Sequence, residues 1–184
     1  MSLPFRIAPI RWEEVLRRSA LSNPSEEEKA LVRSCLREGG RVLDYKITER
    51  NRPVDLLKDD PLREAFSGCG SLIIFTARLG EPFREMVEGQ EDPELAILYR
   101  GLAAERLDAL IESYLDEKER DLRLAGAALT PHFPYHWEGA EETLSTTTRI
   151  VGISFHPEEL KASRCRSCFA ENCPARREKA DADA

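Results

Sequence analysis

The chain has 184 residues, a formal net charge of -7, 33% charged residues and five cysteines. This length predicts one domain with a small appendage, which can bury a core without disulfides. The acidic balance argues against a protein that coats nucleic acid, because such a protein needs a clustered basic face. No apolar run reaches the length of a signal peptide or a membrane span. We therefore expect a globular cytoplasmic protein that binds neither nucleic acid nor membranes.

The N-terminal part predicts two helices and a strand. Residues 10–16 form a short amphipathic stretch. A longer helix is expected to begin at an N-cap Asn23, with Pro24 at its first position, and to end at Gly39 and Gly40. Alternation of apolar and polar residues over 43–48 then predicts a strand with one face in water.

Apolar strands and helices alternate irregularly in the rest of the chain. Residues 71–77 carry apolar side chains on both faces of an extended chain, which predicts a central, fully covered strand. Asp92 and Pro93 open a long amphipathic helix whose charged residues are expected to face solvent. The other predicted elements are helices at 60–66, 82–87 and 141–144 and strands at 127–129 and 149–155. This order predicts an α+β fold with a mostly antiparallel sheet.

The chain is expected to comprise a single α+β domain over 1–160, a Cys-rich metal-binding appendage over 161–177 and a disordered tail over 178–184. The tail is too polar to fold alone.

The Cys-rich appendage holds the strongest local motif, Cys165-x2-Cys168-x4-Cys173, with three cysteines in nine residues. In a chain without a secretory signal, such clustering indicates metal binding before disulfide formation. Thiolates favour zinc, Cu(I) or an iron–sulfur cluster. His156 is a candidate fourth ligand of a zinc site. An iron–sulfur cluster on three cysteines with one open iron, and free thiols, remain alternatives. Cys35 and Cys69, outside this cluster, are interpreted as packing residues.

A loop rich in proline and aromatic residues, from His132 to Trp137, is the second candidate site. Pro134 stiffens the loop together with Pro131. Tyr135 and Trp137 offer flat apolar faces with polar tips, which suit an aromatic or adenine-like ligand. The candidate ligand-binding residues are therefore Tyr135, Trp137, Pro134 and His132. The alternative is a rigid turn that packs its aromatic side chains on the sheet.

Taken in order, these segments resemble the activation, or reactivation, domain of cobalamin-dependent methionine synthase in its free-standing form. The resemblance covers roughly residues 7–177, and the order of the motifs is more specific than any single motif. The features that carry it are an N-terminal helix pair, a strand at 42–48, a turn at Gly68 and Cys69, a strand closing on Leu79 and Gly80, the aromatic loop, and a tail with Cys165, Cys168, Cys173 and Arg176.

This resemblance implies a twisted, mostly antiparallel sheet flanked by helices. It also implies a reactivation factor that binds S-adenosylmethionine at the aromatic loop. The factor presents this methyl donor to a cobalamin carried by a corrinoid protein or by a methionine synthase core. Any reductive methylation of the corrinoid is then shared with that partner, and no residue of this chain is assigned a catalytic role.

The aromatic loop differs from that of the family, which runs from an arginine to Pro-Gly-Tyr. Here the loop has no arginine, Pro134 stands in the place of glycine, and Tyr135 and Trp137 are the matching positions.

The alternative function is that of a non-catalytic accessory protein. This protein binds an iron–sulfur cluster or a zinc ion at the tail cysteines and docks on a redox partner.

Overall fold

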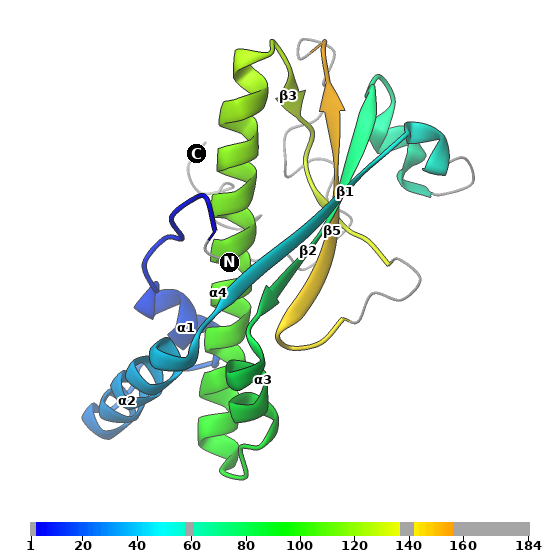
Figure 1. Cartoon of the computed structure of the whole chain (residues 1–184). Coiled ribbons are helices and arrows are strands. Elements are labelled where there is room, and N and C mark those ends of the chain that lie inside the picture. Colours follow the sequence, from blue (N-terminus) through cyan, green and yellow to red (C-terminus); the bar gives the residue numbers. More distant parts are fainter. Residues whose placement is uncertain (1–2, 58–60, 137–141, 157–184) are drawn as a thin grey trace, which may run out of the picture. The chain divides into compact units, whose positions relative to one another are not determined.

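The computed structural model describes residues 3–57, 61–136 and 142–156. Within these ranges lie four α-helices, five strands and two short 3-10 helices (Figure 1). The α-helices are α1 (Trp12–Arg18), α2 (Glu26–Val42), α3 (Glu81–Glu88) and α4 (Pro93–Leu124). The strands are β1 (Tyr45–Arg52), β2 (Ser71–Leu79), β3 (Ala128–Leu129), β4 (Phe133–Pro134) and β5 (Thr146–Ser154). The 3-10 helices are η1 (Val54–Leu57) and η2 (Pro61–Phe66).

The strands form one mostly antiparallel sheet, which confirms the predicted α+β class. Its order is β1-β2-β5-β3, and β4 also pairs with β5. Both short strands run antiparallel to β5, with Ala128 opposite Ser154 and Phe133 opposite Ile150. Strand β5 is therefore central, and most of its residues on both faces are buried. No helix in the described ranges is long and apolar enough to cross a bilayer.

The chain divides into two compact units. The described residues of the first unit lie within 1–48, 76–118 and 137–148, and those of the second within 49–75, 119–136 and 149–184. Helix α4 and strands β1, β2 and β5 contribute residues to both. The predicted domain boundary at residue 160, the appendage and the tail lie outside the described residues.

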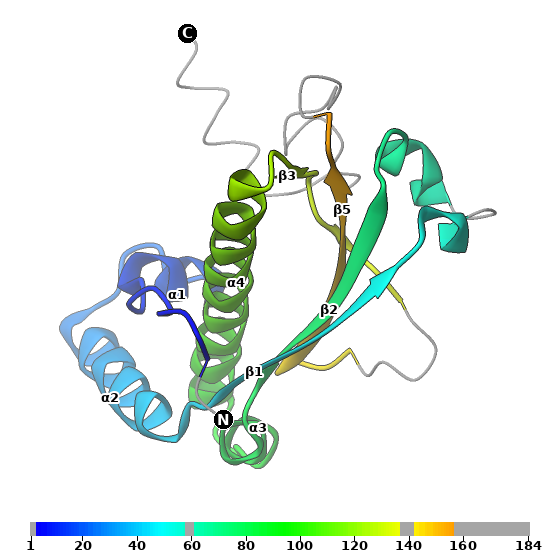
Figure 2. The same cartoon turned by 45° about the horizontal axis from the view of Figure 1, so that its top comes forward.

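In the first unit, α1 and α2 lie on the same side of α4 (Figures 1 and 2). Two glycines allow these helices to approach closely. A Cβ atom on Gly101 of α4 would lie 2.4 Å from the Oγ of Ser19, which caps α1. A Cβ atom on Gly39 of α2 would lie 2.6 Å from Cδ2 of Leu102. Packing against α4 thus explains why α2 continues through Gly39 to Val42, so that the predicted end at Gly39 and Gly40 is wrong.

The N-cap of helix α2 lies two residues later than the predicted Asn23. Ser25 is the N-cap: its Oγ accepts a hydrogen bond from the Glu28 N–H at 3.2 Å. In return, the Glu28 carboxylate accepts from the Ser25 N–H at 2.6 Å, which completes a capping box. Because α2 extends to Val42, strand β1 starts at Tyr45, later than predicted, and runs on to Arg52.

The predicted helix at 141–144 is also wrong over its described residues. Thr143 and Thr146 form an antiparallel bridge around a turn at Leu144 and Ser145. The short segment therefore leads directly into β5, which begins at Thr146.

Two charged residues of α4, Glu105 and Arg106, are buried, contrary to the expectation that the charges of this helix face solvent. They are 0% and 2% exposed. The Arg106 guanidinium donates to the Glu105 carboxylate at 2.5 Å and to the carbonyls of Ala8 and Pro9 at 2.8 and 3.0 Å. The Arg11 N–H donates to the same carboxylate at 3.2 Å. This network anchors the N-terminal segment on α4.

In the second unit, η1 and η2 gather where β1 ends and β2 begins (Figure 2). The turn from η2 into β2 contains Gly68, whose φ of 86° lies in the left-handed region that favours glycine. The Gly70 N–H donates to the carbonyl of Ile153 at 2.9 Å and ties this turn to β5. The candidate site is built on that connection.

Candidate ligand-binding site

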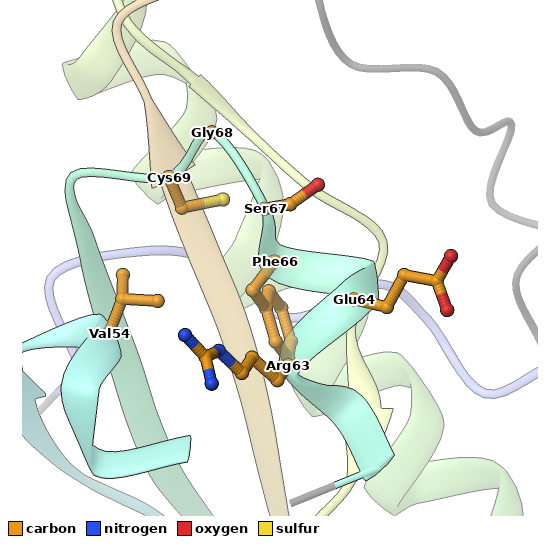
Figure 3. A pocket seen from close by; sticks show the side chains of 7 residues that line it. All are labelled: Val54, Arg63, Glu64, Phe66, Ser67, Gly68 and Cys69. Carbon is orange, nitrogen blue, oxygen red and sulfur yellow. The ribbon is translucent and has the colours of Figure 1, made fainter. Parts of the chain in front are cut away.

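A pocket of about 570 Å³ opens at the turn that precedes β2. Its lining comes from η1, η2 and this turn, and consists of Val54, Arg63, Glu64, Phe66, Ser67, Gly68 and Cys69 (Figure 3). The Arg63 guanidinium reaches toward Val54, whereas Glu64 and Ser67 direct their polar atoms away from it (Figure 3). The volume lies within the range of about 300–1,000 Å³ that is usual for small-molecule sites.

Gly152 of β5 allows the turn to lie close to the sheet. A Cβ atom at this position would lie 2.5 Å from the Sγ of Cys69 and 2.8 Å from Cδ1 of Phe66. Further along β5, the Ser154 hydroxyl donates to the Gly68 carbonyl at 3.5 Å. Cys69 and Phe66 can therefore pack this closely against β5 only because residue 152 has no side chain.

The predicted aromatic loop is fixed to the same part of β5. The rings of Phe133 and Phe66 meet edge to face, with centroids 5.5 Å apart and planes at 85°. Before the loop, Thr130 exchanges two hydrogen bonds with Gly152. The Gly152 N–H donates to Oγ1 at 2.9 Å, and the Thr130 N–H donates to the Gly152 carbonyl at 3.0 Å. Phe66 thus lines the pocket and also packs against Phe133 of the aromatic loop.

The predicted ligand-binding residues that the structure describes, His132, Pro134 and Tyr135, lie outside the pocket lining. Pro134 is exposed in β4, opposite Arg149 of β5, and His132 and Tyr135 are half-buried. Proline is tolerated there because, among the described strands, β4 pairs only with β5, so the missing N–H interrupts no ladder with a second one. Trp137 lies outside the described residues. The assignment of the four residues to a ligand stays a prediction.

The predicted metal centre falls mainly outside the described part of the chain. Cys165, Cys168 and Cys173 are not among the described residues. His156 is exposed, and its N–H donates to the Ser154 hydroxyl at 3.0 Å. Within the described ranges, no group of three or more His, Cys, Asp or Glu side chains is placed to hold a metal ion. The metal site also stays a prediction.

The two described thiols are not activated. Burial raises the pKa of Cys69, and burial followed by the nearby Glu38 carboxylate raises the pKa of Cys35 to about 12. Because the thiolate is the reactive form, both groups are poor nucleophiles near neutral pH. Cys35 is 0% exposed, in agreement with its predicted packing role. Cys69 packs over Gly152 but also lines the pocket.

The pocket is the part of the site that the sequence did not predict. Its main side chains come from two 3-10 helices, which are too short to show a periodic pattern of apolar residues. These side chains are Val54, Arg63 and Phe66. The glycines at 68 and 70, directly before an apolar strand, were the available indication of a special turn. With an aromatic ring, a guanidinium and no activated thiol, the arrangement suits binding rather than covalent catalysis.

Neither a scan against protein-family models nor a search of curated proteins found a match to this chain.

Proposed function

We propose that the protein is a reactivation factor for a corrinoid protein, akin to the activation domain of cobalamin-dependent methionine synthase. In this role it binds S-adenosylmethionine at the aromatic loop and presents the methyl donor to a cobalamin held by the partner. The observation that carries the proposal is the attachment of this loop to the central strand β5. Phe133 pairs with Ile150, and Thr130 bonds twice to Gly152.

Such attachment supports ligand binding because a pre-positioned loop loses little conformational entropy when the ligand arrives. Tyr135 directly follows the paired residues Phe133 and Pro134 and is half-buried, so part of its surface is open to a ligand. A purine ring stacked on this phenol gains about 1–3 kcal/mol, the usual worth of base–aromatic stacking.

Arg149 supplies the guanidinium that the loop itself lacks. It lies directly opposite Pro134 in the antiparallel pair β4–β5, and opposite residues of such a pair share a face of the sheet. A guanidinium binds a carboxylate through two parallel hydrogen bonds. In this proposal Arg149 takes the carboxylate of the methionine moiety, while Tyr135 takes the adenine.

Calorimetric titration of S-adenosylmethionine tests the proposal. Tyr135→Ala should weaken binding about 5- to 150-fold, the equivalent of 1–3 kcal/mol. Arg149→Lys should also weaken it, because an ammonium cannot make the paired contact. Phe155→Ala is the matched control, since Phe155 is an aromatic residue of the same unit, 57% exposed, and outside the loop. Absence of binding by the wild-type chain, or equal binding by all variants, would refute the donor site.

A second candidate function is favoured by the cysteine motif alone. Here Cys165, Cys168 and Cys173 hold zinc or an iron–sulfur cluster, with His156 as a fourth ligand in the zinc case, and the loaded protein docks on a redox partner. Anaerobic purification and metal analysis test it. A brown protein whose absorbance is lost in Cys168→Ser indicates a cluster, and colourless protein with about one zinc per chain indicates a zinc site. Cys35→Ser is the matched control, and metal-free protein would exclude this function.

A further inference from the structure

A second pocket, in the first unit, lies where the turn after α1 meets the beginnings of α2 and α4. Its volume is about 210 Å³. The apolar lining is Leu21 from the turn, Leu31 from α2, and Ile97 and Leu98 from α4. Glu28 and Glu94 also line it. We call it the Ile97 pocket. It is smaller than the roughly 300 Å³ at which small-molecule sites begin, and has room for a single aliphatic side chain.

The Ile97 pocket contains a buried polar group that nothing in the described chain satisfies. Ser19 is 5% exposed and lines the pocket, and its Oγ has no hydrogen-bond partner among the described residues. Its N–H is already used in closing α1, through bonds to the carbonyls of Val15 and Leu16. An unsatisfied buried hydroxyl is destabilising, and a ligand that donates a hydrogen bond to it removes this cost.

The chain around the Ile97 pocket is strongly acidic. Residues 19–31 and 91–98 together carry six carboxylates and one cation, Lys29. That cation already pairs with Glu26 at 2.7 Å. Helices α2 and α4 both begin here, and their two positive ends are together equivalent to only about one elementary charge. The surplus of carboxylates therefore decides the sign of the potential and favours a positively charged ligand.

Ile97 adds an apolar surface at the same place. Its side chain is 49% exposed although it lies one residue before the buried Leu98. An exposed aliphatic residue flanked by carboxylates suits a lysine side chain, whose four methylene groups pack on apolar surface while the ammonium stays with acidic groups.

We propose that the Ile97 pocket binds a lysine side chain from a basic segment of a partner protein. The stem of the lysine packs on Leu31 and Ile97, and its ammonium donates to the carboxylates of Glu28 and Glu94 or to the Ser19 hydroxyl. This interaction surface goes beyond the proposed function, because it uses none of the residues of the aromatic loop or of the pocket near Cys69.

Titration of the full chain with acetyl-trilysine amide, followed by the methyl NMR signals of Leu31, Ile97 and Leu98, tests the proposal. The uncharged probe acetyl-trinorleucine amide has nearly the same side-chain shape. We expect shifts with the lysine probe, their loss at high salt, and at least a ten-fold weaker response to the norleucine probe.

Two variants and a control complete the test. Glu94→Gln and Ile97→Asn, both at exposed positions, should each weaken the lysine probe at least five-fold. Asp116→Asn removes the same charge from an exposed position further along α4 and should change nothing. Equal weakening by Asp116→Asn, an equal response to norleucine, or no shifts at all would overturn the proposal. So would shifts that follow protein concentration alone, since a second copy would then be the occupant.

Discussion

Replacement of Gly152 by alanine tests whether close packing on β5 holds the candidate site together. The added methyl group would lie 2.5 Å from Sγ of Cys69 and 2.8 Å from Cδ1 of Phe66, distances that real Cβ atoms essentially never show. Phe66 is 0% exposed and packed against Phe133, so its ring has little freedom to move. The backbone is also held, because both polar groups of Gly152 are bonded to Thr130.

Two opposing effects set the size of the change. Alanine restricts the unfolded chain, which stabilises the fold by about 0.5–1 kcal/mol wherever glycine is not required for its backbone angles. Overpacking of a buried site costs about 1–3 kcal/mol. Because Gly152→Ala crowds two side chains at once, we place the cost in the upper part of that range, and the net loss in free energy of unfolding at about 1–2 kcal/mol.

Urea unfolding of a double-mutant cycle measures this packing directly. Cys69→Ala removes the nearest contact, so the double variant should lose at least about 0.5 kcal/mol less than the two single variants together. Gly40→Ala is the control, because the nearest atom to a Cβ there is 4.0 Å away. That change should stabilise α2 by up to about 1 kcal/mol. A Gly152→Ala protein as stable as wild type, or strict additivity in the cycle, would refute the packing described for the site.

Three further predictions concern the first unit. Ala20 has a φ of 58° where α1 ends, so Ala20→Gly should raise the free energy of unfolding by about 1 kcal/mol, and a lower urea midpoint would contradict this. Arg106→Met leaves the buried Glu105 carboxylate with the half-exposed Arg11 as its remaining ion partner and should cost about 3 kcal/mol in the same assay; a loss below 1 kcal/mol would be inconsistent with the buried pair. A hydrogen bond from Arg17 and the neighbouring Arg18 lower the pKa of Glu14 from 4.5 to about 2. The stabilisation from this partly exposed carboxylate should therefore be complete above pH 4.5 and lost as the pH falls through 2. Glu14→Gln should be about 1 kcal/mol less stable at pH 7 and equal to wild type near pH 2, whereas a constant difference would contradict the assignment.

The long elements of the fold were predictable because their sequence patterns extend over many residues. The apolar run in β2 and the periodicity of α4 each indicate one structure. Element ends were harder to predict, since Asn23 and Ser25 are both good N-caps. The return hydrogen bond from the Ser25 N–H to the Glu28 carboxylate selects Ser25. Gly39 resembled a helix end locally, but its contact with α4 is a tertiary feature that no local pattern contains.

The candidate site was predictable only in part. Proline and aromatic residues stand out in composition, so the sequence could propose Pro134 and Tyr135 as ligand-binding residues, and that role stays a prediction. The pocket could not be predicted, because it depends on how Phe66 meets β5. The burial of Glu105 and Arg106 could not be read from α4, because charges on an amphipathic helix usually face solvent. The Gly152 of β5 was an available indication of a close approach, which glycine in a strand often marks.

The most direct test of the proposed function is to locate bound methyl donor on the chain. Ultraviolet irradiation of the protein with methyl-tritiated S-adenosylmethionine, followed by digestion and peptide sequencing, maps the covalently labelled residues. The proposed function predicts label in the peptide that contains Tyr135, with loss of that label in Tyr135→Ala and in the presence of excess unlabelled donor. Label confined to other peptides, or none above that of a denatured control, would contradict it.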